Sequence, residues 1–333
     1  MRVTVVGAGV AGLTTALALA ERGCEVEVID RGPSLGAACC SRLAGGMLAP
    51  WCERESAEEL VVTLGQEALA WWPARHPGTL RHGSLVLAPR RDAPELERFA
   101  RRTRRFERLD GDRVAALEPA LAGRFGQGLF FPDEAHLDPR AALVALAARL
   151  GQLGASIRFG IDGLQLLASA NWCIDCRGLA ARDRLGDLRG VKGEMLLLRC
   201  PDIALARPVR LLHPRFPVYV VPRGEGLFMV GATMIESDER TRVTARSLVE
   251  LLNAAYALHP AFAEAEIVEI GSDAQPAFPD NLPRIRQQDR ILFVNGLYRH
   301  GFLLAPALAR RAAGVVLDHA FYPEVMNEDH RQR

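Results

Sequence analysis

The first thirty residues restrict the fold more than any other part of the chain. Val3–Val6 is a short β-branched run, Leu13–Arg22 has the alanine and leucine content of a helix, and Glu25–Asp30 is a second strand-like run. A strand, a helix and a second strand in so short a space predict a parallel pair with a right-handed crossover. This unit is the start of an α/β fold.

The loop between the first strand and the helix, Gly7-Ala8-Gly9-Val10-Ala11-Gly12, has the glycine spacing of a nucleotide-binding loop. Gly7 permits the tight turn, Gly9 lets the backbone approach a pyrophosphate, and Gly12 allows the helix to pack on the strand. The helix N-terminus at Val10 and Ala11 offers N–H groups and a positive dipole end to the phosphates.

An acidic residue completes this pattern. Asp30 ends the second strand eighteen positions after Gly12, and Arg31 follows it. A carboxylate in this place binds a ribose hydroxyl. We therefore expect a dinucleotide site, with a glycine-rich turn that binds nothing as the alternative. The motif alone leaves FAD and NAD open.

Composition excludes several other classes of protein. Lys192 is the only lysine, so a Walker A loop is absent and Schiff-base chemistry has one candidate residue. The net charge of +1 argues against a nucleic-acid partner, and no apolar run approaches the roughly 20 residues of a membrane span. Seven scattered cysteines do not resemble a disulfide framework, so we expect a cytoplasmic location.

A length of 333 residues predicts about two domains. Strand-like segments near both chain ends, with unlike material between, predict interleaving: residues 1–79, 136–190 and 284–333 form the nucleotide-binding domain, and 80–135 and 191–283 form a substrate-binding domain. Helices are expected at Ser56–Trp72 (with Ser56 as cap), Leu137–Leu150, Ala245–Leu258 and Pro306–His319. Further strands are expected at Asn171–Cys176, Met195–Leu198, Pro217–Val221, Leu227–Val230 and Ile291–Asn295.

A run of small residues, Ser41–Pro50, follows the acidic strand and favours a flavin. Small side chains let backbone amides approach the edge of a flat ring. A flexible loop is the alternative.

Several motifs in order along the chain resemble the D-amino acid oxidase superfamily, in particular its glycine oxidase branch linked to thiamine biosynthesis. The resemblance is weakest between about Leu80 and Phe131. Its motifs are Gly7–Gly12, Asp30-Arg31, Ala44–Leu48, Tyr219–Arg223, Val230–Met234, Pro279–Pro283 and Asn295–Pro306. It implies an α/β fold in which a Rossmann-like FAD-binding domain is interleaved with a mainly antiparallel α+β substrate domain.

The resemblance implies FAD-dependent oxidative deamination of glycine or a similarly small amino acid or amine. A hydride passes from the substrate α-carbon to flavin N5, and the imine hydrolyses or supplies thiazole synthesis. Molecular oxygen accepts the electrons and yields hydrogen peroxide. Two alternatives stay open: a flavin-dependent amine or amino acid dehydrogenase with another acceptor, and an FAD-binding subunit that has lost turnover. We expect a homo-oligomer.

The resemblance also assigns residues. Tyr219 and Arg299 would contact the substrate carboxylate, and Met234 would line the pocket; a core tyrosine and a surface salt bridge are the alternatives for the first two. The final helix, from near Phe302, would point its positive end at the flavin. The cofactor-binding residues implied are Gly7, Gly9, Val10, Ala11, Gly12, Asp30, Arg31, Ala44, Gly45, Gly46, Met47, Gly178, Gly296, Tyr298, Arg299, His300, Gly301, Phe302 and Leu303.

One position departs from the family pattern. Gln275 stands where the family has an arginine that forks onto the substrate carboxylate. Glutamine carries no charge, and a charge-assisted hydrogen bond contributes about 1.5–3 kcal/mol. Either a nearby arginine such as Arg284 or Arg299 compensates, or the substrate lacks a free carboxylate, or the position was changed deliberately. Gln275→Arg is expected to lower the Michaelis constant for glycine.

Two further patterns are interpreted as structural. Cys173 and Cys176 form a CxxC without a second pair at zinc spacing, which favours packing in the core. Arg101, Arg102, Arg104, Arg105 and Arg108, on a helix with Glu97 and Glu107, predict a solvated helix face, with nucleic-acid binding as the alternative.

Overall fold

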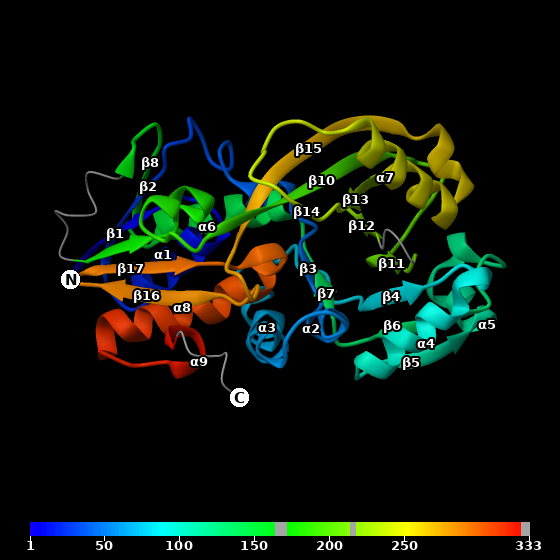
Figure 1. The fold of residues 1–333 in the computed structure, drawn as a ribbon, viewed down its shortest axis with the longest axis horizontal. Coiled ribbons are helices and arrows are strands. Elements are labelled where there is room, and N and C mark those ends of the chain that lie inside the picture. Colours follow the sequence, from blue (N-terminus) through cyan, green and yellow to red (C-terminus); the bar gives the residue numbers. More distant parts are fainter. Residues whose placement is uncertain (164–171, 214–217, 328–333) are drawn as a thin grey trace.

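The computed structural model describes residues 1–163, 172–213 and 218–327. Within these ranges the strands form a six-stranded sheet, a nine-stranded sheet and a two-stranded pair of β3 (Met47–Leu48) with β7 (Ala135–His136). The two large sheets lie in opposite halves of the molecule. The long strands β10 (Arg189–Arg199) and β15 (Glu266–Ala277) run between the halves (Figure 1).

The predicted β-α-β unit is present at the N-terminus as β1 (Arg2–Val6), α1 (Val10–Ala20) and β2 (Glu25–Ile29). The two strands are parallel, with Val3 opposite Val26. α1 begins before the predicted Leu13, because the second half of the glycine loop is already helical: the N–H of Leu13 donates to the carbonyl of Gly9 at 2.9 Å.

The six-stranded sheet unites segments that are far apart in the sequence. Its order is β16-β17-β9-β1-β2-β8, parallel except for the antiparallel β16–β17 pair. The added strands are β8 (Ser156–Arg158), β9 (Cys173–Asp175), β16 (Arg284–Gln288) and β17 (Ile291–Asn295). Asn171, where a strand was expected to begin, lies outside the described residues.

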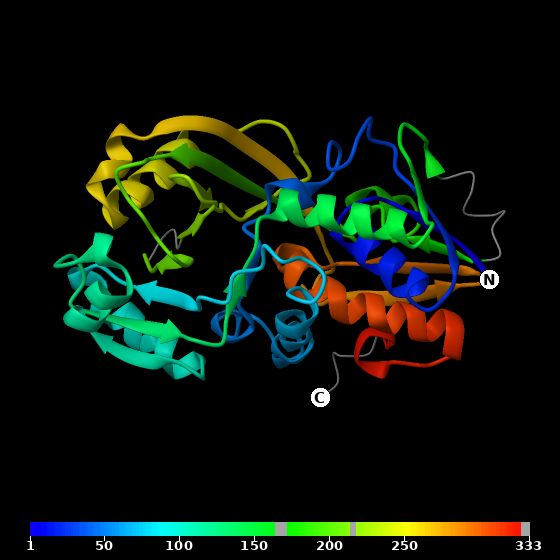
Figure 2. The same cartoon turned by 180° about the vertical axis from the view of Figure 1, so that it is seen from behind.

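Helices pack on this sheet through apolar faces. α8 (Gly301–Asp318) lies against α1 and α3 (Glu59–Trp71), and α6 (Pro139–Gln152) packs on α1 (Figure 2). Leu17 of α1 and Leu304 and Leu308 of α8 are fully buried in the shared core. Two short helices, α2 (Pro50–Glu53) and α9 (Pro323–Met326), complete this half.

The last helix begins at Gly301 and not at the predicted Pro306. Proline at the sixth position removes an N–H that would otherwise bond to the carbonyl of Phe302. The indole Nε1 of Trp72 donates to that carbonyl at 2.8 Å instead. A buried tryptophan from another helix therefore satisfies the acceptor that the proline leaves free.

The predicted cap of the third helix is also wrong. α3 begins at Glu59, and its flanking residue Glu58 makes no capping hydrogen bond with its side chain. The hydroxyl of Ser56 accepts a hydrogen bond from Nη2 of Arg299 at 2.6 Å. The hydroxyl of Ser56, which the sequence predicts as the cap of this helix, therefore binds Arg299 instead.

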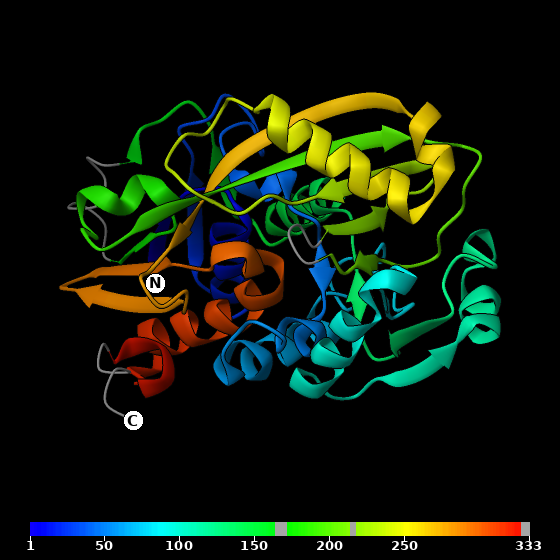
Figure 3. The same ribbon diagram turned by 45° about the vertical axis from the view of Figure 1, so that its right-hand side comes forward.

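The nine-stranded sheet is mainly antiparallel, as predicted, with one parallel pair between β4 and β11. α7 (Ala245–Leu258) lies across its face (Figure 3), while α4 (Ala93–Arg102) and α5 (Gly111–Leu117) lie near β5 and β6. Pro217, the expected start of one strand, lies outside the described residues. The remaining strands are β4 (Ser84–Leu87), β5 (Glu107–Asp110), β6 (Gln127–Phe131), β11 (Val209–Leu211), β12 (Val218–Pro222), β13 (Leu227–Gly231) and β14 (Ile235–Glu236).

The two sheets fit the predicted α/β class with a second, mainly antiparallel unit. We propose that they are the cores of the two interleaved domains, with boundaries near residues 79, 135, 190 and 283. Each sheet has its own apolar cluster of buried side chains, which supports two separate cores.

Candidate active site

The glycine loop shapes the first part of the site. Gly7 has a φ of +107°, which favours glycine, and a Cβ added at Gly12 would lie 1.8 Å from the carbonyl oxygen of Gly7. Gly12 thus allows α1 to pass directly over the loop. Gly9 flanks the start of α1, and the N–H of Val10 donates to Oγ of Ser41 at 3.1 Å.

Asp30 closes this loop from the end of β2. Its Oδ2 accepts from the N–H of Ala8 at 2.7 Å, and its Oδ1 accepts from the N–H of Gly32 at 2.7 Å. Two backbone donors therefore fix the carboxylate beside the glycine loop. Each carboxylate oxygen keeps a further lone pair for a ligand hydroxyl.

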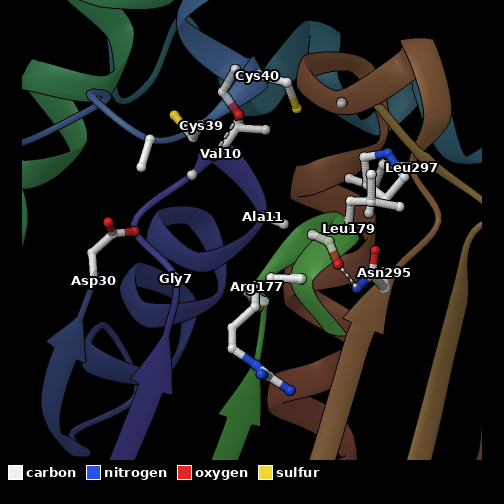
Figure 4. A pocket seen from close by; sticks show the side chains of 18 of the residues that line it. Gly7, Val10, Ala11, Asp30, Cys39, Cys40, Arg177, Leu179, Asn295 and Leu297 are labelled. Carbon is white, nitrogen blue, oxygen red and sulfur yellow. Dashed lines mark hydrogen bonds between the residues drawn. The ribbon is translucent and has the colours of Figure 1, made fainter. Parts of the chain in front are cut away.

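A first cavity of about 970 Å³, including its open mouth, lies at the carboxyl ends of β1, β2, β9 and β17 (Figure 4). This is where parallel sheets bind nucleotides. On its far wall the side-chain amide of Asn295 donates to the carbonyl of Gly178 at 2.9 Å. The predicted cofactor residues that line it are Gly7, Gly9, Val10, Ala11, Asp30, Arg31, Gly178, Tyr298 and Gly301.

A second cavity of about 840 Å³, also including open space, lies at the N-terminus of α8. Gly301 lines both cavities, so they meet at the first residue of that helix. The predicted site residues that line the second cavity are Ala44, Gly45, Gly46, Met47, Tyr219, Met234, Gln275, Arg299, His300, Gly301, Phe302 and Leu303. Most of the site residues predicted from the sequence therefore line two adjoining cavities.

Two predicted cofactor residues line neither cavity. Gly12 packs on the glycine loop, as described above. Gly296 has a φ of +75°, and a Cβ there would lie 2.2 Å from the ring of Phe278. The geometry gives both positions a packing role, and contact with the cofactor stays a prediction for them.

Tyr219 enters the second cavity from β12. Its ring packs against Gly45, where an added Cβ would lie 2.8 Å from Cε2 of the tyrosine. Burial raises the pKa of Tyr219, so the phenol keeps its proton and can donate to an anion. Across the strand pair, Arg210 on β11 stands directly opposite Tyr219.

A buried carboxylate, Glu53 at the end of α2, joins two arginines in this cavity. Its Oε1 accepts from Nη2 of Arg210 at 2.5 Å, and its Oε2 accepts from Nη2 of Arg299 at 2.8 Å. Burial alone would raise the pKa of Glu53, but the two guanidiniums hold it well below its usual range. Glu53 is therefore ionised.

His300 lies beside this group, with Nδ1 3.5 Å from Oε2 of Glu53. Burial lowers the pKa of His300 to about 4, although Glu53 acts in the opposite direction. The imidazole is therefore neutral at neutral pH.

Sequence reasoning missed Glu53 and Arg210. Glu53 stands in an unremarked short helix, and only the fold brings it to α8. Arg210 did carry a signal, because a charged residue in the apolar run Pro208–Leu212 is costly to bury without a function or a partner.

The structure separates the two arginines that could compensate for Gln275. Arg284 donates to Asp280 through both Nη atoms, at 2.9 and 2.7 Å, and its guanidinium stacks 4.6 Å from the ring centroid of Phe278. It does not line the second cavity, which argues against Arg284. Arg299 does line it, together with Gln275.

The remaining motifs have structural roles. Cys173 is 1% exposed and Cys176 6% exposed, as expected for core residues, although Cys176 also lines the first cavity. The predicted arginine-rich helix face ends with α4 at Arg102; Arg108 lies on β5, where it pairs with Glu97, and Arg113 pairs with Glu107. In the described part of the chain, no helix is long and apolar enough to cross a membrane.

A family model described as "FAD dependent oxidoreductase" (DAO) matches residues 2–314. The chain belongs to this family. A Rhizobium etli protein named "Putative thiamine biosynthesis oxidoreductase ThiO" is 56% identical over 97% of this chain and 99% of its own length.

Two further similar proteins extend the comparison. The bifunctional protein ThiO/ThiG of a Nostoc species is 26% identical over 96% of this chain and 53% of its own length, so this chain spans about half of it. The crystal structure of glycine oxidase from Geobacillus kaustophilus has a TM-score of 0.81 and 25% identity, covering 96% of each chain.

The residues present fit the family's cofactor. FAD is elongated, and the two cavities adjoin at Gly301, which lines both. Gly45, Gly46 and Gly178 line them without side chains; a Cβ at Gly45 would collide with Tyr219, and Gly46 and Gly178 have positive φ. The first cavity would hold the adenosine and pyrophosphate, and the surroundings of Gly45 and α8 would hold the flavin ring. This DAO family member is thus an FAD-dependent oxidoreductase.

Proposed function

We propose that this protein oxidatively deaminates glycine or a similarly small amino acid or amine, with oxygen as the electron acceptor. The main support for this proposal is the second cavity, in which Tyr219 and Arg299 lie beside the N-terminus of α8. The glycine oxidase named above, with a similar fold over nearly its whole length, supports the same substrate class.

Bound FAD supplies a ring that accepts a hydride equivalent from the substrate. The protein's own part is to bind and orient. The phenol of Tyr219 and the guanidinium of Arg299 would donate hydrogen bonds to the substrate carboxylate. Met234 would line the pocket beside the substrate. Glu53 is occupied by two guanidiniums and holds them in place.

The N-terminus of α8 adds an electrostatic contribution. Gly301, Phe302 and Leu303 line the cavity, and the first N–H groups of a helix carry partial positive charge. These groups would stabilise negative charge on the reduced cofactor. For glycine the balanced reaction consumes oxygen and water and yields glyoxylate, ammonia and hydrogen peroxide.

We also propose that the imine formed before hydrolysis supplies thiazole formation in thiamine biosynthesis. Support comes from the names of the Rhizobium etli and Nostoc relatives. Growth of cells that lack this protein tests it: a requirement for added thiazole supports the role, and normal growth without thiazole contradicts it. The cytoplasmic location and the homo-oligomer stay predictions.

Anaerobic mixing of the FAD-loaded protein with glycine, N-methylglycine, alanine and methylamine tests the reaction. Loss of oxidised-flavin absorbance with glycine, followed by hydrogen peroxide when oxygen is admitted, is the expected result. Absorbance loss without peroxide would point to the dehydrogenase. A flavin that no amino acid or amine reduces would point to a subunit without turnover.

A further inference from the structure

The second cavity has an unbalanced positive charge. Among its described lining residues, the ionic side chains are Glu53, Arg210 and Arg299, one negative and two positive. Arg210 is only 8% exposed and Glu53 9% exposed, so water screens this pair poorly, whereas the side chain of Arg299 is 24% exposed. A largely buried group with one surplus positive charge is suited to an anionic ligand.

The other acidic group near Arg210 is poorly placed to neutralise it. Glu134 lies outside the lining of the cavity, and its Oε1 accepts from the N–H of Cys52 at 2.8 Å. Burial raises the pKa of Glu134 to about 7, so it carries only part of a charge at neutral pH. Glu134 therefore does not cancel the surplus charge of the second cavity, although Arg210 and Arg299 also line a neighbouring cavity whose lining includes Glu55, Glu58, Glu95 and Asp280.

Arg210 is anchored in this place through one amino group, since its Nη2 binds Glu53. Its Nε is enclosed by the protein and has no hydrogen-bond partner among the described residues, so a ligand in the cavity would reach the guanidinium through its amino groups and not through Nε. Because β11 and β12 pair with Arg210 opposite Tyr219, the guanidinium and the phenol approach the same cavity from adjacent strands.

Gln275 lines this cavity from β15, a different strand. It is the position at which the resemblance places a carboxylate-binding arginine. Gln275 carries no charge at the position where the family pattern has a cation. Arg210 on β11 supplies a cation at another wall of the same cavity.

We propose that Arg210 binds the substrate carboxylate together with Tyr219 and Arg299, in the place of an arginine at position 275. Glu53 is a positioning residue that holds both guanidiniums. This rests on the proposed function for the identity of the substrate, and it predicts selection for carboxylates over neutral amines of the same size.

Acetate, which is glycine without its amino group, tests the site without turnover. Its dissociation constant is measured from the change that it causes in the flavin absorbance of the FAD-loaded protein, with acetamide as the neutral comparison. Arg210→Gln should weaken acetate binding roughly 10- to 100-fold, the effect of one charge-assisted hydrogen bond, and change acetamide binding little.

Arg207→Gln is the matched control. Arg207 is also a buried arginine on the same segment, with Nε 2.7 Å from the carboxylate of Glu118, but it does not line the cavity. This variant should bind acetate as the wild type does. Unchanged acetate binding in an Arg210→Gln protein that retains FAD would overturn the proposal.

The Gln275→Arg variant keeps the proposal testable if Arg210→Gln fails to fold. The expectation from sequence that Gln275→Arg lowers the Michaelis constant for glycine assumes that no other cation binds the carboxylate. With Arg210 in place, a cation at 275 should instead change acetate affinity less than about threefold, because the carboxylate already has its partners. In Arg210→Gln/Gln275→Arg the affinity should return to near the wild-type value. A tenfold or larger gain from Gln275→Arg alone would refute the role of Arg210.

These outcomes separate the inference from the function. Acetate binding that depends on Arg210, in a protein that oxidises no amino acid, would support the carboxylate site and contradict the proposed reaction. Oxidation of methylamine as fast as glycine, with no measurable acetate binding, would overturn the carboxylate site and leave an oxidase.

Discussion

Removal of the negative charge of Glu53 should destabilise the protein and make its stability depend on small anions. Glu53 is the acceptor for both Arg210 and Arg299. Glu53→Gln keeps the volume and one carbonyl acceptor, but it leaves the buried guanidinium of Arg210 and the partly exposed one of Arg299 without this counter-charge. The surplus charge of the cavity then rises from one to two.

The magnitude follows from the burial. Loss of one partner from a buried ion pair costs about 3–5 kcal/mol, and the remaining amide oxygen places this variant near the lower value, about 3 kcal/mol. For 333 residues the unfolding entropy is on the order of 0.7 kcal/mol per kelvin, so the melting temperature should fall by about 4 °C. The more positive cavity should also bind acetate more tightly. A tenfold gain would restore about 1.4 kcal/mol at saturation.

Thermal unfolding of the FAD-loaded protein, with and without acetate at constant ionic strength, measures both effects. Glu67→Gln is the matched control, because Glu67 also bridges two arginines, Arg310 and Arg311, both at 2.8–2.9 Å. Glu67 is 30% exposed at its side chain and distant from the cavity lining, so its loss should cost about 1 kcal/mol or less. Equal melting temperatures for the two variants, or equal stabilisation of both by acetate, would refute the reasoning.

Three further predictions follow from single contacts. Gly12→Ala should lower FAD content and thermal stability, since its Cβ would meet the carbonyl of Gly7 at 1.8 Å. The control Gly151→Ala in α6, where an added Cβ has nothing within 4 Å, should be neutral or slightly stabilising. Equal effects of the two substitutions would count against the loop packing. Asp30→Asn should weaken FAD binding about tenfold in a fluorescence titration, because one of its two charge-assisted bonds, to the N–H groups of Ala8 in the loop and of Gly32, is lost; an unchanged affinity would contradict this. Stability should fall as the pH decreases from about 6.5 to 4, because unfolded His300 and His136 take up protons that their folded pKa values of about 4 and about 3 refuse. In urea titrations His300→Asn should reduce that slope without abolishing it, and an unchanged slope would contradict the burial of a neutral His300.

Local sequence predicted those parts of the fold that local physics determines. The β-α-β unit follows from three glycines at fixed spacing, since Gly7 and Gly12 each fill a place where a side chain would collide. The last motif was equally informative, because Asn295–Pro306 contains the end of β17 and the start of α8, which together border both cavities.

The sequence predictions were wrong where a hydrogen-bond partner far away in the chain takes the place of a local one. Proline at position 306 indicates a helix start, and only the indole of Trp72, on another helix, makes it tolerable inside α8. Ser56 has the sequence of a cap, but the guanidinium of Arg299 binds its hydroxyl. Glu53 and Arg210 belong to one site only because β11 and α2 meet in the folded protein.

The cavity shows why arginine suits this site better than lysine. A lysine ammonium is a single charged point that loses its proton readily when buried, whereas a guanidinium keeps its charge and presents several donors in one plane. Arg210 binds Glu53 through Nη2, and the same plane carries its other N–H donors. Arg210→Lys should therefore bind acetate more weakly than the wild type, because one ammonium cannot bond to Glu53 and to a carboxylate in the same fixed geometry. Lys192, the one lysine of the chain, is held instead between Glu194 and Glu239, at 3.1 and 2.8 Å, where a point charge is sufficient.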